Sequence, residues 1–197
     1  MNEAIVLASE SQARAGLLLA AGIAFEPRPA RIDEAAIKAA GRAEGASADE
    51  VALVLASMKA ARIRAPGRVV VGADQLLVCD GDWFDKPETI EAARRQLLLL
   101  RGKTHTLVTA LVCMKDGVEI WQHVAHPRLR MRGFTDGFLD FYLATEGDAL
   151  LACVGAYRLE GPGIQLFDSV EGEHAAVLGL PLLPLLGFLR QHGTLMV

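Results

Sequence analysis

The segment IVLASESQARAGLLLAAG, residues 5–22, fixes the class of fold. It begins with an apolar run rich in β-branched residues, Ile5–Ala8, which predicts a buried strand. Polar residues follow at 9–11, and Ala13–Ala21 is then a helix-forming stretch that Gly22 ends. A strand that runs directly into a helix is typical of α/β proteins.

The same alternation continues along the chain. Further strands are predicted at Ile23–Glu26, at Val69–Val71 and on through Leu76–Val78, at Thr104–Met114, at Val118–Met131 and around Ile164–Phe167. Further helices are predicted after a capping box at Ser47-x-x-Glu50, from Pro87 to about Leu100, from Thr135 to Gly147, and over Leu182–Gln191. Residues 30–46 favour no assignment. Turns are predicted at Asp80-Gly81 and Lys115-Asp116-Gly117. We therefore expect an α/β fold with one domain over residues 1–197.

Composition excludes several classes of protein. Of the 197 residues, 52% are hydrophobic and 22% are charged, which is typical of a chain that buries a core. The net charge of −4 argues against a nucleic-acid polymer as partner. The longest apolar run, Ala175–Leu189, is shorter than the roughly 20 residues of a membrane span and contains Pro181 and Pro184. We expect no membrane association.

The N-terminus and the cysteines indicate the compartment. The opening MNEAIVLASE has no basic segment, so it does not resemble a signal peptide. Cys79, Cys113 and Cys153 are odd in number and far apart, which favours reduced thiols over disulfides. We therefore expect a cytoplasmic protein.

Polar residues at the first strand–helix junction suggest an anion site. Arg14 lies in the first turn of the predicted helix, where a cation opposes the helix dipole. A bound anion would remove this conflict, because the free backbone N–H groups, the hydroxyls of Ser9 and Ser11 and the guanidinium could all hold it. The alternative is that Ser11 only caps the helix and that Arg14 is solvated.

A carboxylate interrupts the buried strand at Val69–Val78. Asp74 and Gln75 follow Gly72-Ala73, two small residues that leave room for close approach. Burying a carboxylate is costly unless it pairs with a cation, binds a metal or faces a cleft. The alternative is a β-bulge with a satisfied aspartate.

Three more ionisable residues are candidates for the same site. Lys86 precedes Pro87, which restrains the backbone there, and it could reach a phosphate or be solvated. Lys59 lies at the border of an apolar helical stripe, where a lysine that extends to water is the alternative. Glu34 is similarly ambiguous. Cations that hold polyphosphate and carboxylates that bind a divalent metal or activate water are the parts of phosphoanhydride hydrolysis.

Taken together, the motifs resemble the Maf family of nucleoside triphosphate pyrophosphatases over nearly the whole chain. The matching segments are LASESQAR (7–14), Asp33-Glu34, Leu55–Ala60, Gly72–Gln75, Lys86-Pro87, Leu100–His105, Gly155–Tyr157, Glu160–Gly163 and Leu178–Pro181. Their order along the chain makes the resemblance specific. Two positions depart from it: Ala15 stands where many members have a second arginine, and Met58 where many have glutamate. Neither departure touches Asp74, so we expect activity.

The resemblance implies a fold and a reaction. The fold would be a mixed, elongated sheet with two lobes flanking a central cleft. The reaction would convert a modified or non-standard nucleoside triphosphate to the monophosphate and pyrophosphate, with Mg²⁺ or Mn²⁺ as cofactor. Its role would be house-cleaning, the removal of modified or non-standard nucleotides. The resemblance also implies a homodimer.

The resemblance also implies roles for individual residues. Asp74 would accept the proton of the attacking water, and Glu34 would bind the metal with Asp74 or order that water. The phosphates would be neutralised by Arg14, Lys59 and Lys86. The remaining matches place Ser9 and Ser11 beside these cations, and Gln75 and Glu160 near the metal or substrate.

The substrate base and the kind of activity remain open at this stage. Gln75 and Glu160–Ile164 favour the branch of the family that acts on 7-methyl-GTP. Ala73 and Tyr157 are closer to the branch that acts on dTTP and UTP. A non-catalytic nucleotide-binding regulator of septum formation is the alternative function, although the retention of Asp74 and Glu34 favours an enzyme.

Overall fold

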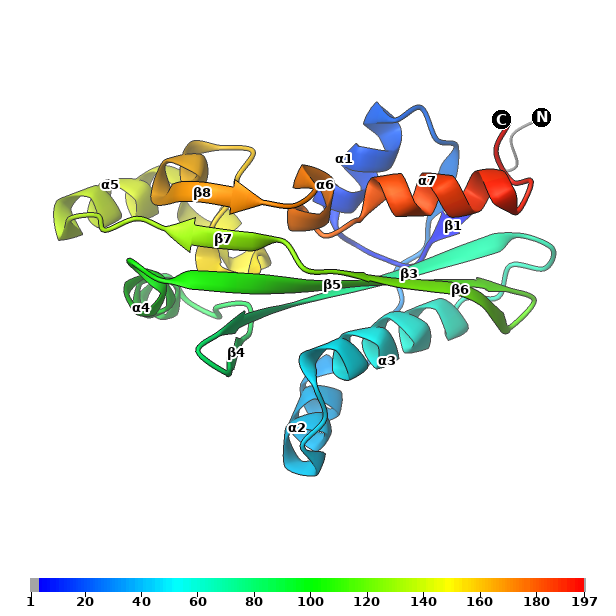
Figure 1. Cartoon of the computed structure of the whole chain (residues 1–197), viewed down its shortest axis with the longest axis horizontal. Helices are drawn as coiled ribbons and strands as arrows, with labels where there is room; N and C mark the ends of the chain where they lie inside the picture. Colours follow the sequence, from blue (N-terminus) through cyan, green and yellow to red (C-terminus); the bar gives the residue numbers. More distant parts are fainter. Residues whose placement is uncertain (1–3, 197) are drawn as a thin grey trace. The chain divides into compact units, whose positions relative to one another are not determined.

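The computed structural model describes residues 4–196 and shows a mixed α/β protein (Figure 1). Its described part contains seven α-helices, three 3₁₀ helices and eight strands. The strands form one open sheet in the order β2-β1-β3-β5-β7-β8, in which β4 pairs with β3 and β6 pairs with β5. The predicted fold class is confirmed.

The chain divides into two compact units. The first contains the described residues up to Gln75, Val108–Ala125 and the described residues from Glu173 onward. The second contains Leu76–Leu107 and His126–Gly172. The predicted single domain with two lobes and a cleft stays a prediction.

The first unit combines parallel strands with an antiparallel hairpin. Its elements are β1 (Ile5–Leu7), α1 (Gln12–Ala20), β2 (Phe25–Pro27), α2 (Glu34–Glu44), α3 (Ala48–Ala61), most of β3 (Val69–Cys79) and of β5 (Thr104–Lys115), β6 (Val118–Ala125), α6 (His174–Val177) and α7 (Leu182–Gln191). Strand β1 pairs in parallel with β2 and β3, and β5 pairs antiparallel with β6. The predicted turn between β5 and β6 is confirmed, since Asp116 and Gly117 have positive φ angles of 52° and 80°.

Helices cover both faces of the sheet in the first unit. Figure 1 shows α1, α6 and α7 on one side of β3, and α3 on the other. The α1 and α7 side is an apolar core in which Leu18, Leu185 and Leu189 pack against alternate residues of β3, Val69 and Val71. Because side chains alternate along a strand, Val70, Gly72 and Asp74 point to the α3 side.

The second unit is assembled from shorter pieces. Its elements are the rest of β3 and β5, β4 (Asp82–Phe84), α4 (Ile90–Leu100), β7 (Arg128–Met131), α5 (Asp136–Glu146), the 3₁₀ helices η1 (Gly147–Ala152), η2 (Val154–Ala156) and η3 (Pro162–Leu166), and β8 (Phe167–Glu171). Leu97, Leu100, Leu129 and Tyr142 are fully buried in it. A 2.8 Å hydrogen bond joins His105 Nε2 to the Tyr157 hydroxyl.

Several local predictions were wrong. Strand β3 is continuous through Gly72–Gln75 and contains no interruption. Helix α4 begins at Ile90 because Thr89 caps it, and not at Pro87. The predicted strand Val118–Met131 is two strands separated by His126 and Pro127, and a proline cannot donate to a ladder.

Three further elements differ from the sequence analysis. The unassigned segment contains helix α2, which begins after Asp33 accepts a hydrogen bond from the backbone of Ala36. The strand predicted around Ile164–Phe167 is mostly the 3₁₀ helix η3. In α5, helical spacing predicts that Phe138, Phe141 and Tyr142 face inward; Tyr142 is buried, whereas Phe141 is 58% exposed.

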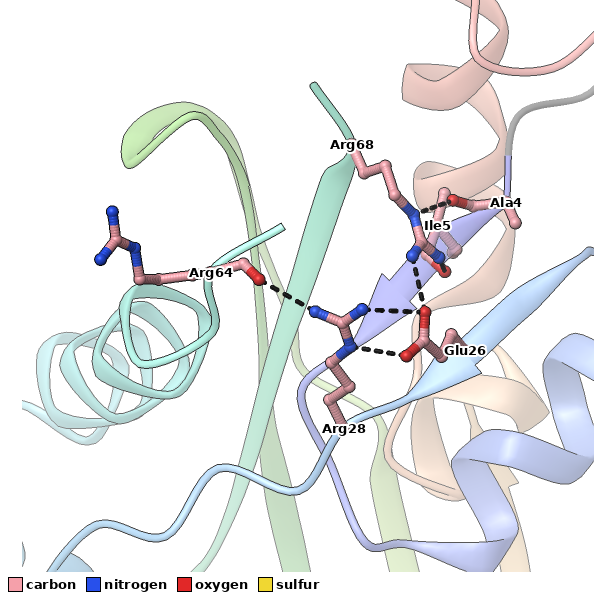
Figure 2. Close-up of polar contacts among 6 residues, drawn as sticks. All are labelled: Ala4, Ile5, Glu26, Arg28, Arg64 and Arg68. Atoms are coloured by element: carbon pink, nitrogen blue, oxygen red, sulfur yellow. Dashed lines mark hydrogen bonds and ion pairs between the residues drawn. The ribbon is translucent and has the colours of Figure 1, made fainter. Parts of the chain in front are cut away.

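An ion-pair network ties strand β2 to its surroundings (Figure 2). The carboxylate of Glu26 lies 2.6 Å from Arg28 Nε and 2.6 Å from Arg68 Nη1. Arg68 also donates to the carbonyl of Ala4, and Arg28 donates to the carbonyl of Arg64. The hydrogen bonds that Arg28 and Arg68 donate to its carboxylate lower the pKa of Glu26 to about 2. The network fixes the start of the segment that leads from β2 to α2.

None of the helices within residues 4–196 combines the length and the apolarity that crossing a membrane requires.

Candidate active site

Asp74 is placed by a close approach between strand β3 and helix α3. Gly72 faces α3, where an added Cβ would overlap the carbonyl oxygen of Ala56 and lie 2.9 Å from the backbone nitrogen of Ala60. Only glycine therefore allows this packing. The contact brings Lys59 of α3 next to Asp74, two residues further along the strand. The spacing explains why small residues precede the carboxylate.

Lys59 joins two carboxylates that are distant in sequence. Its Nζ lies 2.6 Å from Asp74 Oδ1 and 2.6 Å from Glu34 Oε1. The side chains of Lys59 and Asp74 are 9% and 5% exposed, whereas that of Glu34 is 40% exposed. Burial of charge is tolerated here because each charge faces its opposite. Lys59 is thus not a lysine that extends to water.

The second oxygen of Asp74 is unusual. Asp74 Oδ2 is buried and has no hydrogen-bond partner within the described residues. A buried carboxylate oxygen without a partner is costly unless something absent from the protein satisfies it. A proton donor such as water, or a cation, would do so.

Glu34 reaches the site because of the way α2 begins. The Asp33 side chain accepts a hydrogen bond from the backbone of Ala36 and caps the helix. Glu34 is the first residue of α2, where the helix dipole favours a negative charge.

Arg14 is held by three oxygens of the protein. Its Nε donates to the carbonyl of Gly179 at 2.8 Å, and its Nη1 donates to Ser9 Oγ and to the carbonyl of Ala73, both at 3.1 Å. Its Nη2 makes no hydrogen bond to any described residue. Burial lowers the pKa of Arg14, while the charges of Asp74 and Glu34 oppose this shift. Arg14 is therefore not a solvated surface residue.

The serines have distinct positions. Ser11 is the N-cap of α1, since its hydroxyl accepts from the backbone of Arg14 at 3.3 Å. Ser9 accepts from both the backbone of Ser11 and the Arg14 guanidinium. The capping interpretation of Ser11 is confirmed, and Ser9 is the serine whose hydroxyl contacts the arginine side chain.

Gln75 points to the opposite face of β3 from Asp74, as strand alternation requires. Its amide nitrogen donates to Thr109 and to two backbone carbonyls, those of Ala176 and Val177. The described structure thus surrounds this amide nitrogen with protein acceptors.

Lys86 and Glu160 belong to the second unit. Lys86 lies in the exposed segment between β4 and α4. Glu160 lies 3.6 Å from Arg158, which also pairs with Glu146. The pKa of the Cys153 thiol is raised, mainly by burial, and the charges of all four residues act on it. Lys86 and Glu160 thus both act electrostatically on Cys153 of their own unit, and their place beside Asp74 stays a prediction.

Sequence reasoning missed several residues that shape these sites. Arg158 and Glu146 carry no distinguishing signal, since neither falls in an unusual pattern. Thr109 places a hydroxyl within the apolar run Leu107–Cys113, and this break in the pattern could have identified it as a candidate. Gly179 has a φ angle of +94°, which favours glycine, and its carbonyl accepts a hydrogen bond from Arg14.

The residues fit a divalent cation only in part. No group of three or more His, Cys, Asp or Glu side chains that could hold a metal exists in residues 4–196. Mg²⁺, however, is commonly bound by one or two carboxylates together with substrate phosphates and water. Asp74, with its unpartnered Oδ2, and Glu34 supply two carboxylates of this kind.

The chain is similar to known proteins along nearly its whole length. The sequence model of the Maf family, described as "Maf-like protein", matches residues 4–192. A protein of Granulibacter bethesdensis named "Nucleoside triphosphate pyrophosphatase" is 57% identical over 195 residues, 98% of this chain and 99% of its own. One from Rhodospirillum rubrum with the same name is 47% identical, covering 98% and 96%. A Brucella abortus protein named "7-methyl-GTP pyrophosphatase" is 46% identical, covering 97% of each chain.

Proposed function

Because this chain belongs to the Maf family, we propose that it is a nucleoside triphosphate pyrophosphatase that uses the cluster of Arg14, Glu34, Lys59 and Asp74. The observation that supports this function most directly is the pair of carboxylates joined by Lys59. One buried oxygen of Asp74 has no hydrogen-bond partner in the described structure. Such an oxygen can accept the proton of an attacking water.

The proposed reaction is hydrolysis of the phosphoanhydride bond between the α- and β-phosphates. Water adds, the bond breaks, and the nucleoside monophosphate and pyrophosphate separate. Asp74 Oδ2 takes the proton of the water. Lys59 holds Asp74 Oδ1 and so fixes the direction of the second oxygen. Arg14 Nη2 and the N-terminus of α1 offset the charge of the phosphates.

A divalent cation, Mg²⁺ or Mn²⁺, belongs to this proposal. Asp74 and Glu34 would hold it, and the phosphates of the substrate would supply further oxygens. When bound, the cation would lower the charge of the polyphosphate and the pKa of water.

The substrate is proposed to be a modified or non-standard nucleoside triphosphate, which makes the role one of house-cleaning. The names of the relatives support both a general activity and one on 7-methyl-GTP. A homodimer and a cytoplasmic location are also part of the proposal. Light scattering coupled to size-exclusion chromatography tests the dimer.

A pyrophosphate-release assay tests the function. The panel contains 7-methyl-GTP, dTTP, UTP and the standard nucleotides, each with Mg²⁺, with Mn²⁺ and with a chelator. We expect turnover that the chelator abolishes. Asp74→Asn keeps the size of the side chain and removes the base, so turnover falls by at least about 100-fold. Asp168→Asn, at an exposed position of β8, is the matched control and retains full turnover. Nucleotide binding without turnover by the wild-type protein would indicate a regulator instead.

A further inference from the structure

The amide nitrogen of Gln75 is engaged entirely within the protein. It lies 2.8 Å from Thr109 Oγ1, 3.0 Å from the carbonyl oxygen of Ala176 and 3.1 Å from that of Val177. Thr109 is fully buried, and its hydroxyl donates to the same Ala176 carbonyl at 3.0 Å. An amide has two N–H donors, so three nearby acceptors leave none for a substrate.

The two carbonyl acceptors of Gln75 lie where helix α6 ends. The backbone nitrogen of Gly179 donates to the Ala176 carbonyl, and that of Leu180 donates to the Ala175 carbonyl. Helix α6 has only four residues, so its own hydrogen bonds give it little stability. Gln75 and Thr109 therefore anchor residues 176–179 to the sheet.

The same turn determines where the Arg14 guanidinium lies. The Gly179 carbonyl accepts from Arg14 Nε at 2.8 Å, the shortest hydrogen bond that this side chain makes within the described structure. An added Cβ at Gly179 would lie 3.1 Å from Nε. The turn thus both receives the arginine and leaves space for it.

We propose that Gln75 is a positioning residue for Arg14: it fixes the turn at 176–179, and the Gly179 carbonyl then orients the guanidinium. This differs from the expectation that Gln75 contacts metal or substrate. The inference rests on the proposed function only in that Arg14 binds phosphate. The orientation of Arg14 itself can be measured without turnover.

The first test follows the Arg14 Nε–H signal by ¹H–¹⁵N NMR in the full-length protein. The signal is identified by its absence in Arg14→Lys. Gln75→Glu has the same shape but places an acceptor against two carbonyls, so the Nε–H signal should shift and exchange with water about tenfold faster. Gln122→Glu makes the same change at an exposed position of β6 and should leave the signal unchanged.

Two variants at Thr109 keep the test decisive if Gln75→Glu does not fold. Thr109→Val has the same shape and removes the hydroxyl, so it should also shift the Arg14 Nε–H signal and speed its exchange with water. Thr109→Ser keeps a hydroxyl, so its Arg14 Nε–H signal should match that of the wild type. An unchanged Nε–H signal in either Gln75→Glu or Thr109→Val would overturn the proposal.

The second test uses titration with inorganic pyrophosphate. Gln75→Glu should weaken pyrophosphate binding about tenfold in the wild-type background and have no further effect in the Arg14→Lys background, because both changes remove the same interaction. If instead Gln75→Glu weakens pyrophosphate binding by the same factor in both backgrounds, Gln75 contacts the ligand directly and the proposal is overturned. If the protein releases no pyrophosphate from any nucleotide, the proposed function is wrong. The NMR test does not depend on turnover, so it still decides whether Gln75 positions Arg14.

Discussion

Replacement of Lys59 by methionine tests whether the ion pairs hold the site together. Lys59→Met keeps the length of the side chain and removes the ammonium group that lies 2.6 Å from Asp74 Oδ1. Loss of one partner from a buried ion pair costs about 3–5 kcal/mol. Glu34 is 40% exposed and can turn to water, so the cost comes mainly from Asp74. We expect the free energy of unfolding to fall by about 3 kcal/mol, the low end of that range.

A second substitution makes the prediction sharper. Asp74→Asn in the Lys59→Met background removes the uncompensated buried charge. The double variant should therefore be about 1–2 kcal/mol more stable than Lys59→Met alone. Urea denaturation followed by circular dichroism measures the stability of both variants and of the wild type. Lys103→Met is the matched control, because Lys103 pairs with Asp80 at 2.9 Å where both side chains are well exposed, and its denaturation midpoint should not change.

Two results would refute this reasoning. If Lys59→Met is as stable as the wild type, the carboxylates do not depend on the ammonium group. If Asp74→Asn destabilises the Lys59→Met protein further, Asp74 contributes through contacts other than the ion pair.

Two other predictions follow from the packing of α3 and from the Glu26 network. Gly72→Ala places a methyl group against the backbone of Ala56, so it should destabilise the protein by about 1–3 kcal/mol and also reduce turnover, as measured by urea denaturation and pyrophosphate release. The pKa of Glu26 is about 2 in the folded protein, below that of an ordinary carboxyl, so its contribution to stability is complete above about pH 5 and is lost as the pH falls toward 2. Glu26→Gln should accordingly be less stable than the wild type at pH 7, with a gap in urea midpoint that closes near pH 2; a constant gap would contradict this.

Features determined by neighbouring residues could be predicted from the sequence. The capping box at Ser47 and Glu50 is present, with reciprocal hydrogen bonds. The turn at Asp80-Gly81 joins β3 to β4, and both residues have positive φ angles. Such signals involve groups three or fewer residues apart, so the local sequence contains the whole cause.

Features determined by distant partners could not be predicted. Asp74 looked like an interruption of its strand, because the cation that satisfies it lies 15 residues earlier on a helix. Residues 30–46 gave no assignment, although Asp33 caps a helix whose first residue completes the charge cluster. The amide of Gln75 bonds to carbonyls about 100 residues later in the chain. Burial and pairing decide these cases, and pattern alone cannot supply the partner.

The chemistry of the lysine reconciles its predicted and observed roles. The family resemblance implies that Lys59 neutralises the phosphates, whereas the structure pairs it with Asp74 and Glu34. An ammonium group has three hydrogens, and the two carboxylates use two of them, which leaves one for a phosphate oxygen. In the proposed reaction, Asp74 likewise uses one oxygen for Lys59 and keeps the other for a proton. Each group of the cluster can therefore hold its neighbour and act on a substrate at once, so substitutions within the cluster should combine non-additively.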